Sequence, residues 1–206
     1  MNIKKKLKKE KSVKKNTIWF SVIIMIIMTY VVFALYYSGY FKGGEIFFSF
    51  LYIVVVDGLL ILNILRIISN DKFEFYLSND NEKIKIKDGL LSSPFSINLD
   101  WIYYIDAAPK ANADDIEVLI VSKKGKRNKR FLPFDDNLVK AKPYYKNTYK
   151  YIMENKPCKD LYYYIVRKSG AKKYYYLYLI YKNAYDANFS DRALDYIKDF
   201  SEEYNL

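Results

Sequence analysis

The N-terminal third of the chain contains two long apolar segments. Residues 17–41 form a run of 25 residues without a charge, and a second apolar block covers residues 46–69. A helix needs about 20 apolar residues to cross the hydrocarbon core of a membrane. Only four residues clearly separate the two blocks, which leaves room for a tight turn. We therefore predict a membrane α-helical hairpin of two transmembrane helices over residues 17–69.

Charges near the helix ends predict the orientation of this hairpin. Residues 1–16 contain eight Lys and one Glu, a net charge of 8 − 1 = +7, whereas Lys42 and Glu45 cancel in the turn. Basic residues remain on the cytoplasmic side, so residues 1–16 become a basic cytoplasmic tail. The first run is too long for a signal peptide, and no small-x-small cleavage site follows it. We expect a multi-pass protein of the cell membrane with both termini in the cytoplasm.

The lysines between Lys4 and Lys15 permit two interpretations. They are either the topology signal in a solvated tail or a contact with anionic lipids or nucleic acid. Each Lys close to an anionic leaflet contributes about 1 kcal/mol, so generic lipid contact is expected. Specific recognition by this tail is the weaker hypothesis.

Asp57 lies within the second span, near the middle of the membrane. A carboxyl group at this depth costs about 2.5–3.5 kcal/mol on insertion scales, which makes it a functional candidate. In an antiparallel hairpin Thr29 lies opposite Asp57. A neutral Asp57 hydrogen-bonded to Thr29, or to a neighbouring chain, would hold helices together. The alternative is ion or proton transport, although no other ionisable side chain lies at a similar depth.

The composition excludes several classes of catalytic site within this chain. It has no His and one Cys among 206 residues, so Ser-His, Cys-His and His-metal chemistry are absent. One Cys also excludes an internal disulfide. None of the seven Gly residues forms a phosphate-binding loop. We expect no catalytic residues, no cofactor and no metal site.

Residues 70–206 are predicted to form a mainly β, α+β domain. Their charges nearly balance, with 24 basic and 20 acidic residues, a net charge of 24 − 20 = +4. Short apolar runs with period-two alternation or strand-rich composition, separated by polar turns, predict a meander of strands. The six expected strands cover residues 73–77, 83–87, 95–99, 102–105, 116–122 and 130–134.

Two helices and a second hairpin are expected after the meander. Pro143 suits the first turn of a helix over residues 142–154. The tyrosine-rich runs 161–167 and 172–182 predict a β-hairpin. Ser190 is a good N-cap for a last helix, whose buried face would contain the following residues: Ala193, Ile197, Phe200 and Tyr204.

Short motifs in the meander resemble a family of bacterial membrane proteins. They are Lys87-Asp88-Gly89-Leu90, Leu99-Asp100-Trp101-Ile102, the strand Glu117–Ser122 with its Lys-Gly-Lys turn, and Phe131-Leu132-Pro133 before a helix. Together with the two spans, these elements resemble the YcxB-like proteins and their PH-like cytoplasmic domains over about residues 17–155. The resemblance implies a PH-like fold for residues 70–206 and a membrane-tethered binding or scaffolding module without known enzyme chemistry. Residues 160–206 depart from the pattern by an added hairpin and helix.

Two basic clusters are the candidate contact sites. The first comprises Lys123, Lys124, Lys126, Arg127, Lys129 and Arg130, and the second comprises Arg167, Lys168, Lys172 and Lys173. On hairpin tips they would be solvated turns, contacts for anionic lipid headgroups, or contacts for a partner. The loop between the first two strands, which is basic in phosphoinositide-binding PH domains, is acidic here at Asp80 and Glu82, so that activity does not carry over.

Tyrosines at 162–164 and 174–176 could stack bases, as single-strand-binding sheets do. Alternation sends half of them into the core, and the domain is tethered and nearly balanced in charge, so we expect no nucleic acid. The expected function is a non-catalytic scaffold or regulator whose partners are membrane lipids, other proteins or further copies of the hairpin. The alternative is a membrane stress or immunity-type protein that acts through an oligomerising hairpin.

Overall fold

The computed structural model describes residues 2–78, 80, 82–90, 92–110, 115–125, 129–155 and 160–206. The chain divides into two compact units. One unit is Lys8–Asp71, and the other combines Met1–Leu7 with Lys72–Leu206.

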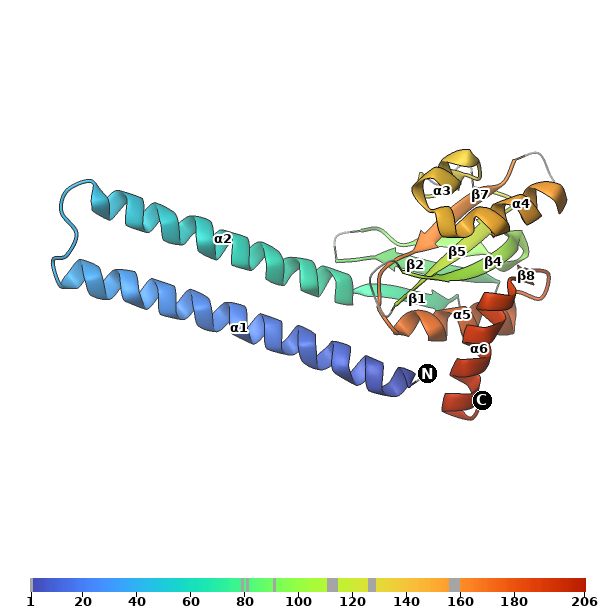
Figure 1. Cartoon of the computed structure of the whole chain (residues 1–206), viewed down its shortest axis with the longest axis horizontal. Helices are drawn as coiled ribbons and strands as arrows, with labels where there is room; N and C mark the ends of the chain where they lie inside the picture. The colour runs from blue at the N-terminus through green and yellow to red at the C-terminus, as the bar shows by residue number, and fades with distance from the viewer. Residues whose placement is uncertain are drawn as a thin grey trace. The chain divides into compact units, whose positions relative to one another are not determined.

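The first unit is a helical hairpin, as predicted. Helix α1 (Ile3–Tyr37) and helix α2 (Glu45–Asp71) run antiparallel (Figure 1). The ring of Phe33 packs edge-on against that of Phe50 at 5.7 Å between centroids. Between the helices, Gly39 and Gly43 have φ of 68° and 60°, a left-handed conformation that glycine adopts without strain.

The apolar surface of both helices faces outward. Only 11% of the most apolar stretch of α1 and 6% of that of α2 is buried within the protein. A core helix of a soluble protein would bury most of such a stretch. Both helices are long and apolar enough to cross a membrane.

Helix α1 starts much earlier than the predicted span. It begins at Ile3, so the lysine-rich segment before Thr17 is helical. Lysine is a good helix former, and the Asn2 side chain caps the start by accepting a hydrogen bond from the Lys5 amide at 2.7 Å. The segment that was predicted to be a tail is therefore part of a regular helix.

The second unit contains two sheets, and the first is an antiparallel meander. It has the order β1-β2-β3, with β1 (Phe73–Leu77), β2 (Lys83–Asp88) and β3 (Phe95–Asn98). The predicted period-two pattern is confirmed, because alternate residues such as Ile84 and Ile86 are buried.

The second sheet has five strands in the order β6-β7-β5-β4-β8. All neighbours pair antiparallel except β8, which is parallel to β4. Every residue of β5 is buried, because both faces of this sheet are covered. The strands are β4 (Ile102–Pro109), β5 (Ile116–Ser122), β6 (Leu132–Pro133), β7 (Tyr162–Val166) and β8 (Asn188–Phe189).

Each face of the five-stranded sheet has its own hydrophobic core. Ile105 and Val118 belong to a core shared with the first sheet, α5 (Lys172–Asn183) and α6 (Asp191–Tyr204). Leu119 and Val121 face the opposite core. Figure 1 shows α3 and α4 on that second side. This side is covered by α3 (Asp136–Ala141), the 3-10 turn η2 (Pro143–Tyr145) and α4 (Lys146–Asn155).

The second predicted hairpin is wrong in its second half. Residues 162–166 form β7 as expected, but the following tyrosine-rich run is the helix α5. Tyr174, Leu177 and Ile180 repeat at every third position and are all buried, which is the spacing of one helix face. Tertiary packing of this face outweighs the strand preference of tyrosine.

The other helix predictions hold in large part. Helix α4 with η2 matches the helix expected over 142–154, although α3 was not foreseen. Ser190 caps α6 by accepting a hydrogen bond from the Ala193 amide at 3.1 Å. Three of the four expected core residues of α6 are buried, and Tyr204 is half-buried. The domain is thus a mixed α/β unit with more helix than was predicted.

Candidate functional site

A pocket of about 310 Å³ opens at the outer edge of β7. Strand β6 has two residues and pairs only with Tyr162 and Tyr163. Within the described residues, no strand therefore pairs with the outer edge of β7 beyond Tyr163. We call this space the β7-edge pocket. The residues that line it include Phe73, Asp88, Arg130, Tyr164, Arg167 and Lys168.

The β7-edge pocket brings the two predicted basic clusters together. Arg130 comes from the segment before β6, whereas Arg167 and Lys168 directly follow β7. Asp88 at the end of β2 forms an ion pair with Lys168 at 2.9 Å. Three cationic side chains and one carboxylate thus share one pocket, which leaves a formal charge of +2.

Aromatic rings position Arg130. Its guanidinium lies over the Phe95 ring at 4.7 Å from the centroid. Phe95 in turn packs edge-on against Tyr164 at 5.1 Å. A cation above a ring face is stabilised by about 0.5–2 kcal/mol. The side chain is therefore held against the sheet and does not extend into solvent.

Burial and the charges around the pocket shift the pKa of the Tyr164 phenol. Burial raises the pKa of Tyr164 well above its ordinary value, and the Asp88 carboxylate raises it further. Arg130 and Arg167 act on this pKa in the opposite direction. Arg130, Arg167 and Tyr164 all line this pocket.

The remaining members of the first basic cluster do not line this pocket. Lys124 is exposed, with its ammonium group 5.1 Å from the centroid of the Trp101 ring. Lys129 is exposed and Lys123 is half-buried. Lys126 and Arg127 lie outside the described residues. Of the predicted cluster, Arg130 alone is placed in the pocket by the described residues.

Lys173 is a correction to the predicted second cluster. The side chain is fully buried, 2.6 Å from the Asp115 carboxylate, so it cannot contact an external anion. It also donates a hydrogen bond to the Arg167 carbonyl at 3.1 Å. Burial lowers the pKa of Lys173, although Asp115 opposes this shift. Because α5 turns Lys173 inward, only Lys172 of this helical pair is exposed.

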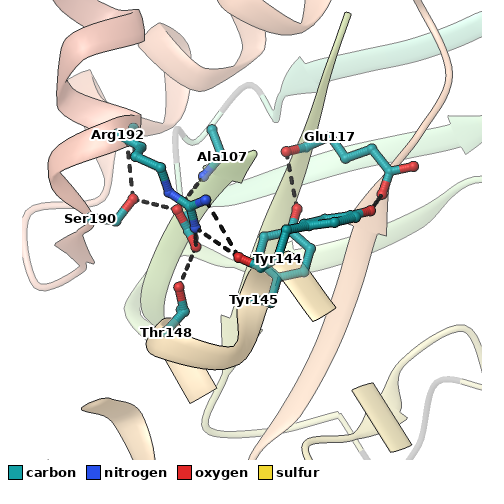
Figure 2. A network of polar contacts seen from close by, with 9 residues as sticks. Ala107, Glu117, Tyr144, Tyr145, Thr148, Ser190 and Arg192 are labelled. Atoms are coloured by element: carbon teal, nitrogen blue, oxygen red, sulfur yellow. Dashed lines mark hydrogen bonds and ion pairs between the residues drawn. The ribbon is translucent and has the colours of Figure 1, made fainter. Parts of the chain in front are cut away.

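A second polar cluster is buried between the sheet and its helices (Figure 2). Asp106 of β4 is fully buried, and its carboxylate accepts hydrogen bonds from Thr148 of α4 and from Ser190. It also forms an ion pair with Arg192 of α6 at 2.6 Å and accepts the Ala107 amide at 2.7 Å. These contacts join three elements that are distant in the sequence.

Glu117 is the other buried acid on this face. Its carboxylate accepts hydrogen bonds from the Tyr144 hydroxyl at 2.5 Å and from Lys142 at 3.0 Å. The Tyr145 hydroxyl donates to the Glu117 carbonyl at 3.1 Å (Figure 2). Burial alone would raise the pKa of Glu117, but the bonds from Tyr144 and Lys142 bring it below its ordinary value.

Asp106 is saturated with donors, whereas the Glu117 carboxylate accepts two, from Tyr144 and Lys142. A carboxylate has about four lone-pair positions, and Asp106 receives four donor groups. A ligand of Asp106 would therefore have to displace one of these donors. Sequence analysis did not identify these residues, and the available signal was an acid within an otherwise apolar strand. We assign the cluster to the stability of the domain.

The first residues of α1, which belong to the second unit, contact the end of α6. The Glu203 carboxylate accepts hydrogen bonds from the Ile3 and Lys4 amides, each at 2.6 Å. Ile3 is fully buried, and the Lys4 ammonium lies 4.6 Å from the centroid of the Tyr204 ring. An acid at a helix N-terminus is stabilised by the helix dipole. The sequence signal that could have predicted this contact is Ile3 and Leu7, an apolar pair at i, i+4 among lysines.

The predicted intramembrane pair is present in the helical hairpin. The Thr29 hydroxyl donates to the Asp57 carboxylate at 3.4 Å. The other oxygen of Asp57, Oδ1, is buried and has no hydrogen-bond partner among the described residues. The two side chains thus join α1 to α2, and the Oδ1 atom of Asp57 can still accept a hydrogen bond.

Comparison of the chain with models of protein families, with curated proteins and with solved structures returned no match.

Proposed function

We propose that this protein spans the membrane twice and presents its second unit in the cytoplasm as a non-catalytic, PH-like binding module. In this role it acts as a scaffold or regulator that contacts membrane lipids or a protein partner. The observation that carries the proposal is the outward-facing apolar surface of α1 and α2. Such a surface is stable only when lipid or another apolar partner covers it.

The orientation rests on charge. Eight lysines precede the first span and the turn between the helices is neutral, which favours a cytoplasmic N-terminus. Two crossings then return the second unit to the same side. The balanced charge of that unit and its lack of histidine support binding in place of catalysis.

The PH-like assignment is supported by the order of the elements. Strands β1 to β3 are antiparallel in one sheet, β4 and β5 are antiparallel in the next, and a helix, α5, follows β7. The motif residues Asp100-Trp101-Ile102 lie where η1 (Leu99–Trp101) leads into β4, and Leu132-Pro133 form β6. The segment α3–α4 between β6 and β7, and α6 after β8, are additions to a small barrel.

Cysteine labelling in cells tests the topology. In a Cys158→Ser background, Gly44→Cys places a thiol in the turn, where a Cβ has open space. Tyr185→Cys places one in the second unit at a residue that is 90% exposed. We expect an impermeant maleimide to label the first variant in intact cells and the second only after permeabilisation. Labelling of the second variant in intact cells would refute the proposed orientation.

A second candidate function is supported by the hairpin itself. The unused oxygen of Asp57 could bind a second copy of the chain, as polar groups do between membrane helices. The protein would then act as an immunity-type or stress protein through an oligomeric hairpin. Asp57→Leu should convert cross-linked oligomers into monomers, whereas Asn63→Leu, an exposed polar residue of the same helix, should not. Unchanged cross-linking in Asp57→Leu would reject this function.

A further inference from the structure

The β7-edge pocket has the composition of an anion site. Arg130, Arg167 and Lys168 supply three positive charges against the single carboxylate of Asp88. Arg and Lys donate charge-assisted hydrogen bonds to phosphate and carboxylate oxygens, and these are the strongest that side chains make. The pocket combines this charge with the Tyr164 phenol in its wall.

Two of the three cationic side chains, Arg130 and Lys168, are held in place before any ligand binds. Arg130 rests on the Phe95 ring, and Lys168 is paired with Asp88 at 2.9 Å. The backbone of Arg167 is also held, because the ammonium group of the buried Lys173 donates a hydrogen bond to the Arg167 carbonyl oxygen. Groups that are already ordered lose less entropy when they bind a ligand. This support distinguishes the pocket from a row of mobile surface lysines.

Size and charge favour a phosphate ester as the ligand. About 310 Å³ lies at the lower end of ligand pockets, which suits one small headgroup and excludes a folded peptide. The planar fork of Arg matches the tetrahedral oxygens of phosphate in a bidentate manner. With two arginines and one lysine, the pocket can contact several oxygens of the same phosphate.

Chain length connects the pocket to the end of a membrane-spanning segment. Phe73 lines the pocket and follows Asp71, the last residue of α2, by two positions. Two residues span at most about 7 Å. One wall of the pocket is therefore within this chain length of the end of an apolar helix. In the proposed topology the end of α2 leaves the bilayer among the lipid headgroups, which carry phosphate.

We propose that the β7-edge pocket binds a phosphate ester group, supplied by the headgroup of an anionic phospholipid. This inference rests on the proposed function, since a lipid source requires the protein to be membrane-embedded. It names the ligand class of the binding module and the residues that hold it: Arg130, Arg167 and Lys168.

Calorimetric titration of the full-length protein in a neutral maltoside detergent tests the inference. The probes are inorganic phosphate, short-chain phosphatidic acid, and a glutamate-rich peptide that represents an acidic protein partner. We expect both phosphate compounds to bind. Arg167→Gln removes an exposed guanidinium from the pocket and should weaken phosphatidic acid binding at least about tenfold, the loss of one charge-assisted hydrogen bond.

Two controls separate binding from folding and from general charge. Lys150→Gln combined with Lys198→Gln removes two exposed cations on other elements, and should leave the affinity within about twofold. Arg130→Gln should weaken binding like Arg167→Gln. The melting temperature of each variant shows whether the domain is still folded, and Arg167→Gln should melt with the parent because its side chain is exposed.

Each binding result either supports or overturns the lipid source or the phosphate site. Binding of phosphatidic acid alone, or together with inorganic phosphate, supports the lipid source. Binding of inorganic phosphate alone retains the phosphate site and overturns the lipid source. Equal affinity in Arg167→Gln and in the parent, or preference for the acidic peptide, overturns the pocket as a phosphate site. Failure of the topology test would instead overturn the proposed function, so the two failures are distinguishable.

Discussion

Replacement of Asp106 by Asn tests whether the buried cluster stabilises the domain. The substitution keeps the shape of the side chain and removes its charge. The new amide group would face the donors of Thr148 and Arg192, which need an acceptor. Removing one partner of a buried ion pair costs about 3–5 kcal/mol. Because the Arg192 side chain is 40% exposed and can be solvated, we expect a loss of about 2–3 kcal/mol.

Urea unfolding of the full-length protein in detergent measures this loss. The chain has two tryptophans, and in a Trp19→Phe background the fluorescence of Trp101 reports on the second unit alone. With a slope of about 2 kcal/mol per molar urea, the midpoint should fall by about 1–1.5 M. Thr148→Val should cost about 1.5–3 kcal/mol, the value of a hydrogen bond to a charged group.

A matched control and a double-mutant cycle complete this test. Asp100→Asn changes an exposed acid of the same unit and should shift stability by no more than about 0.5 kcal/mol. The double variant Asp106→Asn, Thr148→Val should show a coupling of at least about 0.5 kcal/mol, because the two groups are in contact. The structural role of the cluster is refuted if Asp106→Asn unfolds within about 0.5 kcal/mol of the parent.

Three further predictions follow from close contacts and pKa shifts. A Cβ at Gly125 would lie 2.5 Å from Tyr162 Cβ, so Gly125→Ala should lower the melting temperature by displacing the basic turn. Burial raises the pKa of Tyr104 to about 12. Its contribution to stability should be present below about pH 10 and be lost as the pH rises toward 12, as seen by Trp101 fluorescence. Burial raises the pKa of Glu203, but the hydrogen bonds from the Lys4 and Ile3 amides outweigh this effect and bring the pKa below its ordinary value. Glu203→Gln should therefore lower the melting temperature at pH 7, and the difference from the parent should shrink as the pH falls through this lowered pKa, because the parent carboxylate then becomes protonated.

The elements with strong periodicity could be predicted from the sequence. The two apolar runs, the strands β1 to β5 and the helix capped by Ser190 all show a local pattern that agrees with their final burial. The lysine segment before Thr17 gave no apolar pattern, so its helix was missed. Its stability comes from contacts such as Glu203 with the Ile3 amide, which link residues 200 positions apart.

Lys168 and Lys173 show why the candidate site could be predicted only in part. Both belong to one basic cluster in the sequence, and charge alone does not separate them. The pocket includes Lys168, whereas α5 buries Lys173 beside Asp115. The choice between strand and helix for residues 172–183 decides which lysine faces solvent, and local composition favoured the wrong choice.

The two polar sites of the second unit differ in charge balance and in exposure. Asp106 and Glu117 are enclosed and already accept donors from Thr148, Arg192 and Tyr144, so their charges are spent on holding helices to the sheet. At the β7 edge, cations outnumber carboxylates by two and line an open pocket. An excess of positive charge at an open pocket attracts an anion. This charge balance agrees with the proposed binding of a phosphate ester.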